Sequence, residues 1–110
     1  MWILRTQHGQ DPVLTFRLLP GTIKTLGRAV RADFIVDAAL VSRLHCRLTA
    51  LPTGQLAVED LQSTNGTYVN GKRVIEATLL PGDTLRVGRI ELVLVHAPLQ
   101  QVDTTLEVGS

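Results

Sequence analysis

Short runs in which apolar and polar residues alternate recur along most of the chain. A period of two indicates half-buried β-strands, and Gly, Pro, Asn or Asp residues bound nearly every run. The predicted strands are residues 2–6, 13–19, 22–26, 34–36, 44–51, 55–59, 67–69, 72–74, 84–87 and 90–95. Residues 75–80 lack this pattern and are interpreted as a loop. Residues 30–40 do not predict a helix, because Asp33 and Asp37 fall where its apolar face would continue.

The turns between these runs indicate the fold class. About ten short strands with a turn every eight to twelve residues favour an all-β sandwich or barrel. Asn70-Gly71 predicts a hairpin of type I′, because both residues tolerate positive φ. Gly88-Arg89 predicts a second hairpin, of the Gly-X type II′.

The composition is that of an ordinary soluble globular protein. The 110 residues suffice for one domain, which we place at residues 1–96, with the less patterned residues 97–110 as a tail or linker. The net charge of +1 and the 4% aromatic content do not favour binding to nucleic acid, and no apolar stretch of about 18 residues predicts a membrane span. Residues 1–5 lack the features of a secretory signal, so we expect no membrane association and a cytoplasmic location.

Neither a metal site nor an active site is predicted. Cys46 is the single cysteine, which excludes an internal disulfide, and the three histidines are scattered along the sequence. Cys46 and His45 would point to opposite faces of a strand, so they do not form a dyad. Ser42 and His45 lack the Gly-X-Ser-X-Gly elbow of a nucleophile. We therefore expect a binding protein without cofactor, metal or enzymatic activity.

Three loops contain more polar groups than turns require. They are Gly27-Arg28, residues 42–45 and residues 63–66. Loops at one end of a sandwich are held by rigid strands and lie near one another. The pair Asn65-Gly66 also differs from the hairpin pair Asn70-Gly71, because two hydroxyl residues and Asp60 precede it. We expect these loops together to hold an anion.

The order and spacing of these motifs resemble those of the forkhead-associated (FHA) domain, a phosphothreonine-binding module. The matching motifs are Gly27-Arg28, residues 33–37, residues 42–45, residues 60–67 and Asn70-Gly71. The resemblance extends from about residue 22 to about residue 95. It implies a β-sandwich of about eleven mostly antiparallel strands. Loops at one end would bind a phosphothreonine-containing protein or peptide in Ser/Thr kinase signalling, without catalysis.

The resemblance also implies roles for individual residues in binding the ligand. Arg28 matches the arginine that binds the phosphate, and the Ser42 hydroxyl would donate a hydrogen bond to the same phosphate. Arg43 would reach the phosphate or the peptide backbone. Thr64 would contribute to phosphate binding and to the notch for the threonine methyl group. The Asn65 amide would bind the peptide main chain just after the phosphothreonine.

Other residues have supporting roles in the resemblance. His45 would brace the binding loops by hydrogen bonds. Gly27 and Gly66 would have a structural role in the backbone of those loops, and Gly66 would adopt a positive φ at low cost. Leu40 lies in the loop that helps to select the third residue after the phosphothreonine, where an apolar side chain would favour an aliphatic residue. Cys46 is interpreted as a buried core thiol.

The sequence leaves two further hypotheses open. In the first, the sandwich is a phospho-independent interaction module that assembles with another protein through its surface or its edge strands. In the second, the ligand is phosphorylated Thr104 or Thr105 of the chain's own tail or that of a neighbouring molecule. About ten residues separate these threonines from Val95 and would reach roughly 30 Å when extended. Binding to the chain's own cleft is therefore sterically possible, with little linker length to spare.

Overall fold

The computed structural model describes residues 1–7 and 9–97. These residues form eleven strands and no helix. In chain order the strands are β1 (Trp2–Thr6), β2 (Thr15–Leu18), β3 (Ile23–Gly27), β4 (Phe34–Ile35), β5 (Cys46–Ala50), β6 (Leu56–Asp60), β7 (Thr67–Val69), β8 (Lys72–Val74), β9 (Glu76–Leu79), β10 (Thr84–Val87) and β11 (Ile90–His96). The all-β prediction is therefore confirmed.

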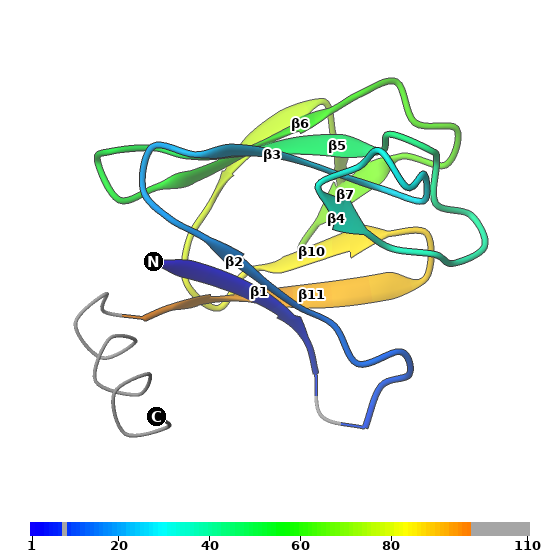
Figure 1. The fold of residues 1–110 in the computed structure, drawn as a ribbon, viewed down its shortest axis with the longest axis horizontal. Helices are drawn as coiled ribbons and strands as arrows, with labels where there is room; N and C mark the ends of the chain where they lie inside the picture. Colours follow the sequence, from blue (N-terminus) through cyan, green and yellow to red (C-terminus); the bar gives the residue numbers. More distant parts are fainter. Residues whose placement is uncertain (8, 98–110) are drawn as a thin grey trace.

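The strands form two sheets that stack face to face as a sandwich (Figure 1). One sheet has the order β2-β1-β11-β10-β7-β8, and the other has the order β4-β3-β5-β6-β9. Among the described strands only β3 and β4 pair in parallel. The loops after β3, β4 and β6 gather at one end of the sandwich, on the right in Figure 1. The fold thus places the three polar loops of the sequence together.

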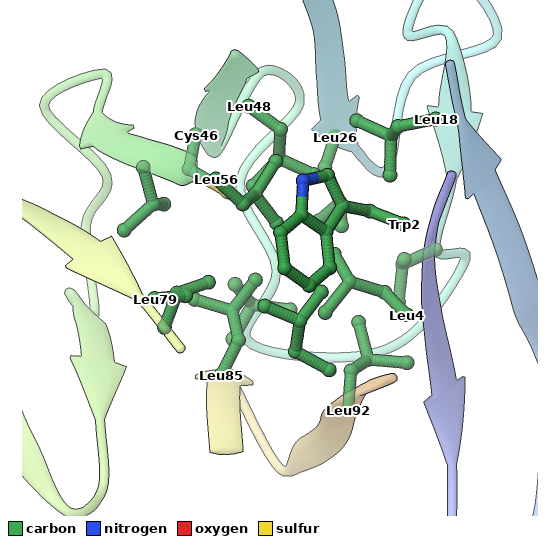
Figure 2. Close-up of a cluster of buried hydrophobic side chains, with 14 of the residues drawn as sticks. Trp2, Leu4, Leu18, Leu26, Cys46, Leu48, Leu56, Leu79, Leu85 and Leu92 are labelled. Carbon is green, nitrogen blue, oxygen red and sulfur yellow. The ribbon is translucent and has the colours of Figure 1, made fainter. Parts of the chain in front are cut away.

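The core lies between the sheets and consists mainly of leucine side chains. Figure 2 shows Trp2 surrounded by leucines that both sheets contribute. The leucines with no exposed surface are Leu4, Leu18, Leu26, Leu48, Leu56, Leu79, Leu85 and Leu92. Burial of each such side chain contributes about 1.5 to 3 kcal/mol. This core fixes the strands, and the strands fix the starting points of the loops.

Cys46 belongs to the same core. Its side chain is fully buried. Burial, with a smaller effect from the negative charge of Asp60, raises the pKa of the Cys46 thiol to about 12. Since the thiolate is the reactive form, this cysteine is an inert core residue, as predicted.

The interpretation of residues 75–80 as a loop is wrong. β9 pairs antiparallel with β6, and Leu79 lies opposite Leu56. The side chains that β9 turns toward the core are Ala77 and Leu79. Because alanine gives only a weak apolar signal, the alternation was not visible in the sequence. This strand is formed by its pairing in the tertiary structure rather than by its own pattern.

Both predicted tight hairpins are present. Asn70 and Gly71 join β7 to β8 with φ values of 50° and 83°, as a type I′ turn requires. Gly88 begins the turn between β10 and β11 with a φ of 60°, the value at the first central position of type II′. Local turn chemistry therefore sets both connections.

The two ends of the described chain lie side by side. The Met1 amino group donates to the Ala97 carbonyl, and the Ala97 N–H donates to the Met1 carbonyl, both at 2.9 Å. Residues 98–110 are outside the described residues, so the predictions of a tail and of self-binding through Thr104 or Thr105 stay predictions. Within the described residues, no helix has the length and apolarity needed to cross a membrane.

Candidate functional site

Three loops, β3–β4, β4–β5 and β6–β7, surround one open cleft of about 970 Å³. The residues that line it are Arg28, Arg31, Asp37, Ala38, Ala39, Leu40, Val41, Ser42, Arg43, Leu44, Gln62, Thr64 and Asn65. The structure thus brings together all the residues that the sequence assigned to ligand contact or selection: Arg28, Leu40, Ser42, Arg43, Thr64 and Asn65. His45, Gly27 and Gly66 are not among the lining residues.

Arg28 is held at the end of β3 by the loop opposite. Its main-chain N–H donates to the Ser42 carbonyl at 2.9 Å, and its Nε donates to the Val41 carbonyl at 3.1 Å. A β-carbon at Gly27 would lie 2.1 Å from the Arg43 carbonyl oxygen, so only glycine permits this close approach. The Arg28 terminal nitrogens make no hydrogen bond to the described residues, so they stay available to donate hydrogen bonds in the cleft.

His45 connects two of the loops from below the cleft. Its ring is fully buried. The Ser42 main-chain N–H donates to Nδ1 at 3.0 Å, so Nδ1 is unprotonated and Nε2 carries the hydrogen. Nε2 then donates to the Gly66 carbonyl at 2.8 Å. The ring therefore braces the β4–β5 loop against the β6–β7 loop, and both of its nitrogens are occupied.

Ser42 and Thr64 meet across the cleft. The Thr64 main-chain N–H donates to Ser42 Oγ at 3.0 Å. Because this contact uses an acceptor site of Oγ, the hydroxyl hydrogen of Ser42 stays available to donate to a ligand. The exposed Thr64 lies beside it at the surface of the β6–β7 loop.

Asn65 and Leu40 meet at another edge of the cleft. Asn65 Nδ2 donates to the Leu40 carbonyl at 3.1 Å. Leu40 has a φ of 71°, a left-handed conformation that is uncommon for leucine, and its side chain is 45% exposed. The amide of Asn65 retains Oδ1 and one N–H for an extended ligand.

A polar cluster below the β6–β7 loop was not recognised as a brace from the sequence. Asp60 Oδ1 accepts hydrogen bonds from Ser63 Oγ at 2.5 Å and Thr67 Oγ1 at 2.7 Å, and Oδ2 accepts one from the Ser63 N–H at 3.1 Å. Ser63 Oγ in turn accepts a hydrogen bond from the Gly66 N–H at 2.9 Å. An Asp three residues before a Ser, with a Thr four residues further on, was the available signal.

The same hydrogen bonds set the charge state of Asp60. Burial would raise the pKa of its carboxyl, but the hydrogen bonds from Ser63 and Thr67, with a smaller effect from His45, outweigh it. The pKa therefore lies below its ordinary value of 3.8. The loop is built around a carboxylate that stays ionised at neutral pH.

Positive charge is concentrated at the cleft. Arg28, Arg31 and Arg43 line it, and Asp37 is the only carboxylate among the lining residues. The sequence did not assign a role to Arg31. Among residues 1–7 and 9–97 the only ion pair within 4 Å joins Arg47 to Glu59, outside the cleft. Although the net charge of the chain is only +1, the cleft is therefore suited to an anion.

Comparison with known proteins places this architecture in a family. The family model of the FHA domain matches residues 24–88. The glycogen accumulation regulator GarA of Mycobacterium tuberculosis is 37% identical over 86 residues, which cover 78% of this chain and 52% of GarA. The ABC transporter ATP-binding/permease protein Rv1747 of the same species is 39% identical over 93 residues, which cover 84% of this chain and 10% of the transporter. This chain therefore spans about half of GarA and a small part of the transporter.

A solved structure agrees with the sequence match. It comes from a structural and functional analysis of phosphothreonine-dependent FHA domain interactions and is 31% identical to this chain. The two superpose with a TM-score of 0.74, over 89% of this chain and 98% of the other. From the family match and the shared sandwich fold, the chain belongs to the FHA domain family.

Proposed function

We propose that this FHA domain binds a phosphothreonine-containing segment of a partner protein in the cleft formed by its three loops. It would thereby mediate a phosphorylation-dependent protein–protein interaction in Ser/Thr kinase signalling. The observation that carries the proposal is that the Arg28 guanidinium, held by the Val41 carbonyl, and Ser42 line the same cationic cleft. The similarity to a structure from work on phosphothreonine-dependent FHA interactions, and to a protein named as a regulator, supports it.

The phosphate would bind to Arg28, Ser42 and the β6–β7 loop. The Arg28 guanidinium gives charge-assisted hydrogen bonds of about 1.5 to 3 kcal/mol each. The Ser42 hydroxyl would donate to the same phosphate, because its acceptor side is already taken by Thr64. Arg43 would add charge from the cleft wall. Thr64 would contact the phosphate and the threonine methyl group.

The peptide chain would lie against Asn65 and Leu40. Asn65 is anchored to the Leu40 carbonyl, so its remaining amide groups are held in place for the peptide main chain. The exposed Leu40 side chain would contact a residue beyond the phosphothreonine. Gly27, His45 and Gly66 would act indirectly, by holding the loops in position.

The hydrogen bonds of His45 support binding without catalysis. A hydrolytic site at Ser42 would need a base in contact with the hydroxyl. His45 Nδ1 accepts the main-chain N–H of Ser42 rather than contacting its Oγ, and Nε2 donates to the Gly66 carbonyl. Neither ring nitrogen is free to take a proton from the hydroxyl, so the proposed activity is recognition alone.

We also place the binding unit at residues 1–96 and its activity in the cytoplasm. The pairing of β1 with β11, in which Trp2 lies opposite His96, supports this boundary, because it joins the first and last strands of the sandwich. Phosphorylated Thr104 or Thr105 is a further proposed ligand. Adding phosphate to these threonines and following the Arg28 and Ser42 amide signals by NMR tests it, since unchanged signals at every concentration would exclude self-binding.

Titration of one threonine peptide with and without its phosphate tests the main proposal. The phosphorylated form should bind, and Arg28→Ala should weaken it by at least about 2 kcal/mol while the fold is retained. Phosphoserine should bind several-fold less tightly than phosphothreonine, because a methyl contact is worth about 1 kcal/mol. Equal affinity for the two forms of the threonine peptide would instead favour a phospho-independent interaction module.

A further inference from the structure

The outer face of the six-stranded sheet carries concentrated positive charge outside the cleft. Four arginines alternate with inward side chains and point outward from β1, β2, β8 and β10: Arg5, Arg17, Arg73 and Arg86. Glu91 on β11 is the acidic residue of the same face. Within residues 1–7 and 9–97, none of these arginines has a carboxylate within 4 Å. This face can therefore attract an acidic partner.

One row on this face is organised around an aromatic ring. Arg73 and Arg86 lie directly across the strands from Tyr68, one on each side. The Arg86 Cζ atom lies 4.0 Å from the centroid of the Tyr68 ring, and Arg86 Nη1 donates to the Gly88 carbonyl at 3.1 Å. We call Arg73, Tyr68 and Arg86 the basic row.

The stacking fixes the plane of the Arg86 guanidinium, which has five N–H groups. The single hydrogen bond to Gly88 leaves the others available. A fixed planar guanidinium is suited to paired contacts with a carboxylate, at a lower entropic cost than a free arginine side chain. Glu91 lies opposite Arg86 on the neighbouring strand but forms no ion pair with it. The Arg86 guanidinium is therefore not neutralised by this carboxylate.

The basic row is continuous with the cleft. At one end, Arg73 covers Gly66, since a β-carbon there would lie 2.6 Å from Arg73 Nε, and Gly66 directly follows the cleft residue Asn65. At the other end, Arg86 bonds to Gly88, where a β-carbon would lie 3.0 Å from the carbonyl oxygen of the cleft residue Ala39. A ligand that leaves the cleft beside Asn65 would therefore pass onto the row.

We propose that the basic row extends the cleft and binds carboxylates of acidic residues that flank the phosphothreonine in the partner segment. The proposal rests on the proposed function, because it is the bound phosphothreonine that brings the flanking residues to the row. Complementary charge and contact with the cleft favour a peptide over other anions. Selection for an acidic flank would then be a property of the sheet face rather than of the phosphate-binding loops.

Three phosphothreonine peptides test the proposal on the full chain by fluorescence anisotropy. The first has alanines on both sides, the second has four glutamates after the phosphothreonine, and the third has four glutamates before it. Four extended residues span about 13 Å, enough to leave the cleft in either direction. One of the two acidic peptides should bind about fivefold more tightly than the alanine peptide, as expected for two exposed charge pairs.

Variants of the arginines test whether the basic row causes the tighter binding of the acidic peptide. Arg86→Gln should reduce the ratio between the acidic and alanine peptides to near one, and Arg73→Gln is a second variant with the same expected direction. Arg17→Gln, which removes the same charge from the same face on β2, is the matched control and should keep the ratio. A ratio that survives both row variants, or that Arg17→Gln reduces equally, would overturn the proposal.

The peptides also separate the two proposals. If the alanine peptide binds but neither acidic peptide binds more tightly, the basic row does not bind the flanking acidic residues. The proposed phosphothreonine site is retained in that case. If none of the phosphorylated peptides binds, the proposed function fails and this extension fails with it.

Discussion

Asn65-Gly66 and Asn70-Gly71 are the same dipeptide five residues apart in the sequence, and the structure uses them differently. In Asn70-Gly71 both residues have positive φ and form a tight hairpin. The Asn70 side chain bonds to the β9–β10 turn and the start of β10, 13 and 14 residues further along the chain, where Nδ2 donates to Asp83 Oδ1 at 3.1 Å and Oδ1 accepts the Thr84 N–H at 2.9 Å. This pair connects two strands.

In Asn65-Gly66 only the glycine has positive φ, at 91°. The Gly66 carbonyl accepts from His45, 21 residues away, and the Asn65 amide donates to Leu40, 25 residues away. Its partners thus hold it against a distant loop and against the cleft. The comparison teaches that Asn-Gly favours a turn, whereas the segments to which the pair bonds decide the conformation of that turn and whether it is a connection or part of a binding site.

The largest expected effect comes from removing the brace under Asn65-Gly66. His45→Phe leaves the Ser42 N–H and the Gly66 carbonyl without partners, so the free energy of unfolding should fall by about 3 kcal/mol. Urea denaturation measures this. His96→Phe is the control, because His96 is exposed and its ring packs against Trp2 at the edge of the core. A loss as small in His45→Phe as in the control would mean that the ring is not a brace.

The two glycines give a matched pair with a smaller effect. Gly66→Ala and Gly71→Ala each place alanine at positive φ, which should cost about 1 to 2 kcal/mol of stability. Only at Gly66 would the new β-carbon meet another residue, Arg73, whereas nothing lies within 4 Å at Gly71. Phosphopeptide affinity should therefore fall several-fold in Gly66→Ala alone. Equal affinities in the two variants would remove the distinction between the turns.

The two asparagines should separate binding from stability. Asn70→Ala loses the hydrogen bonds to Asp83 and Thr84 and places alanine at a φ of 50°, so stability should fall by at least about 1 kcal/mol, with phosphopeptide affinity unchanged. Asn65→Ala loses one exposed hydrogen bond and a proposed peptide contact, so affinity should fall about tenfold with little change in stability. Calorimetric titration and urea denaturation of both variants provide the check, and the opposite assignment would contradict the account.

The smallest effect is a dependence of stability on pH. The pKa of Asp60 is lowered in the folded protein, so its contribution is complete above about pH 4 and is lost as the pH falls through the lowered folded value. Urea midpoints below pH 4 should therefore fall less steeply in Asp60→Asn than in the unaltered chain. Asp33, whose pKa is lowered mainly by the Thr25 main-chain N–H, would supply part of the remaining slope. Equal slopes would show that Asp60 is not the titrating brace.

The sequence predicted most of the fold because alternation and turn residues are local signals. Ten of the eleven strands were anticipated, and Asn70-Gly71 and Gly88 fixed two hairpins. β9 was missed because its inward Ala77 adds little apolar signal and its pairing with β6 is a tertiary contact. The alternation of this strand rests on one alanine and one leucine, which is too weak a signal to detect in the sequence.

The lining of the cleft was predicted better than its support. Arg28 and Ser42 stand in recognisable motifs, but Ser63 was singled out only as an extra hydroxyl and proves to bond inward to Asp60. Which of the adjacent residues Ser63 and Thr64 points inward depends on the turn at Gln62, whose φ of 58° the sequence does not reveal. The left-handed conformation of Leu40 could not be predicted for the same reason, because the sequence does not reveal its φ of 71°.

The central claim is that a phosphate holds the ligand at the loop end that contains Asn65-Gly66. Titration of the chain with a phosphothreonine peptide, followed by two-dimensional NMR of the main-chain amides, tests it most directly. The account predicts shifts at Arg28, Ser42 and Asn65, none at Asn70-Gly71, and no response to the unphosphorylated peptide. Equal shifts with the unphosphorylated peptide, or shifts confined to other parts of the sandwich, would contradict it.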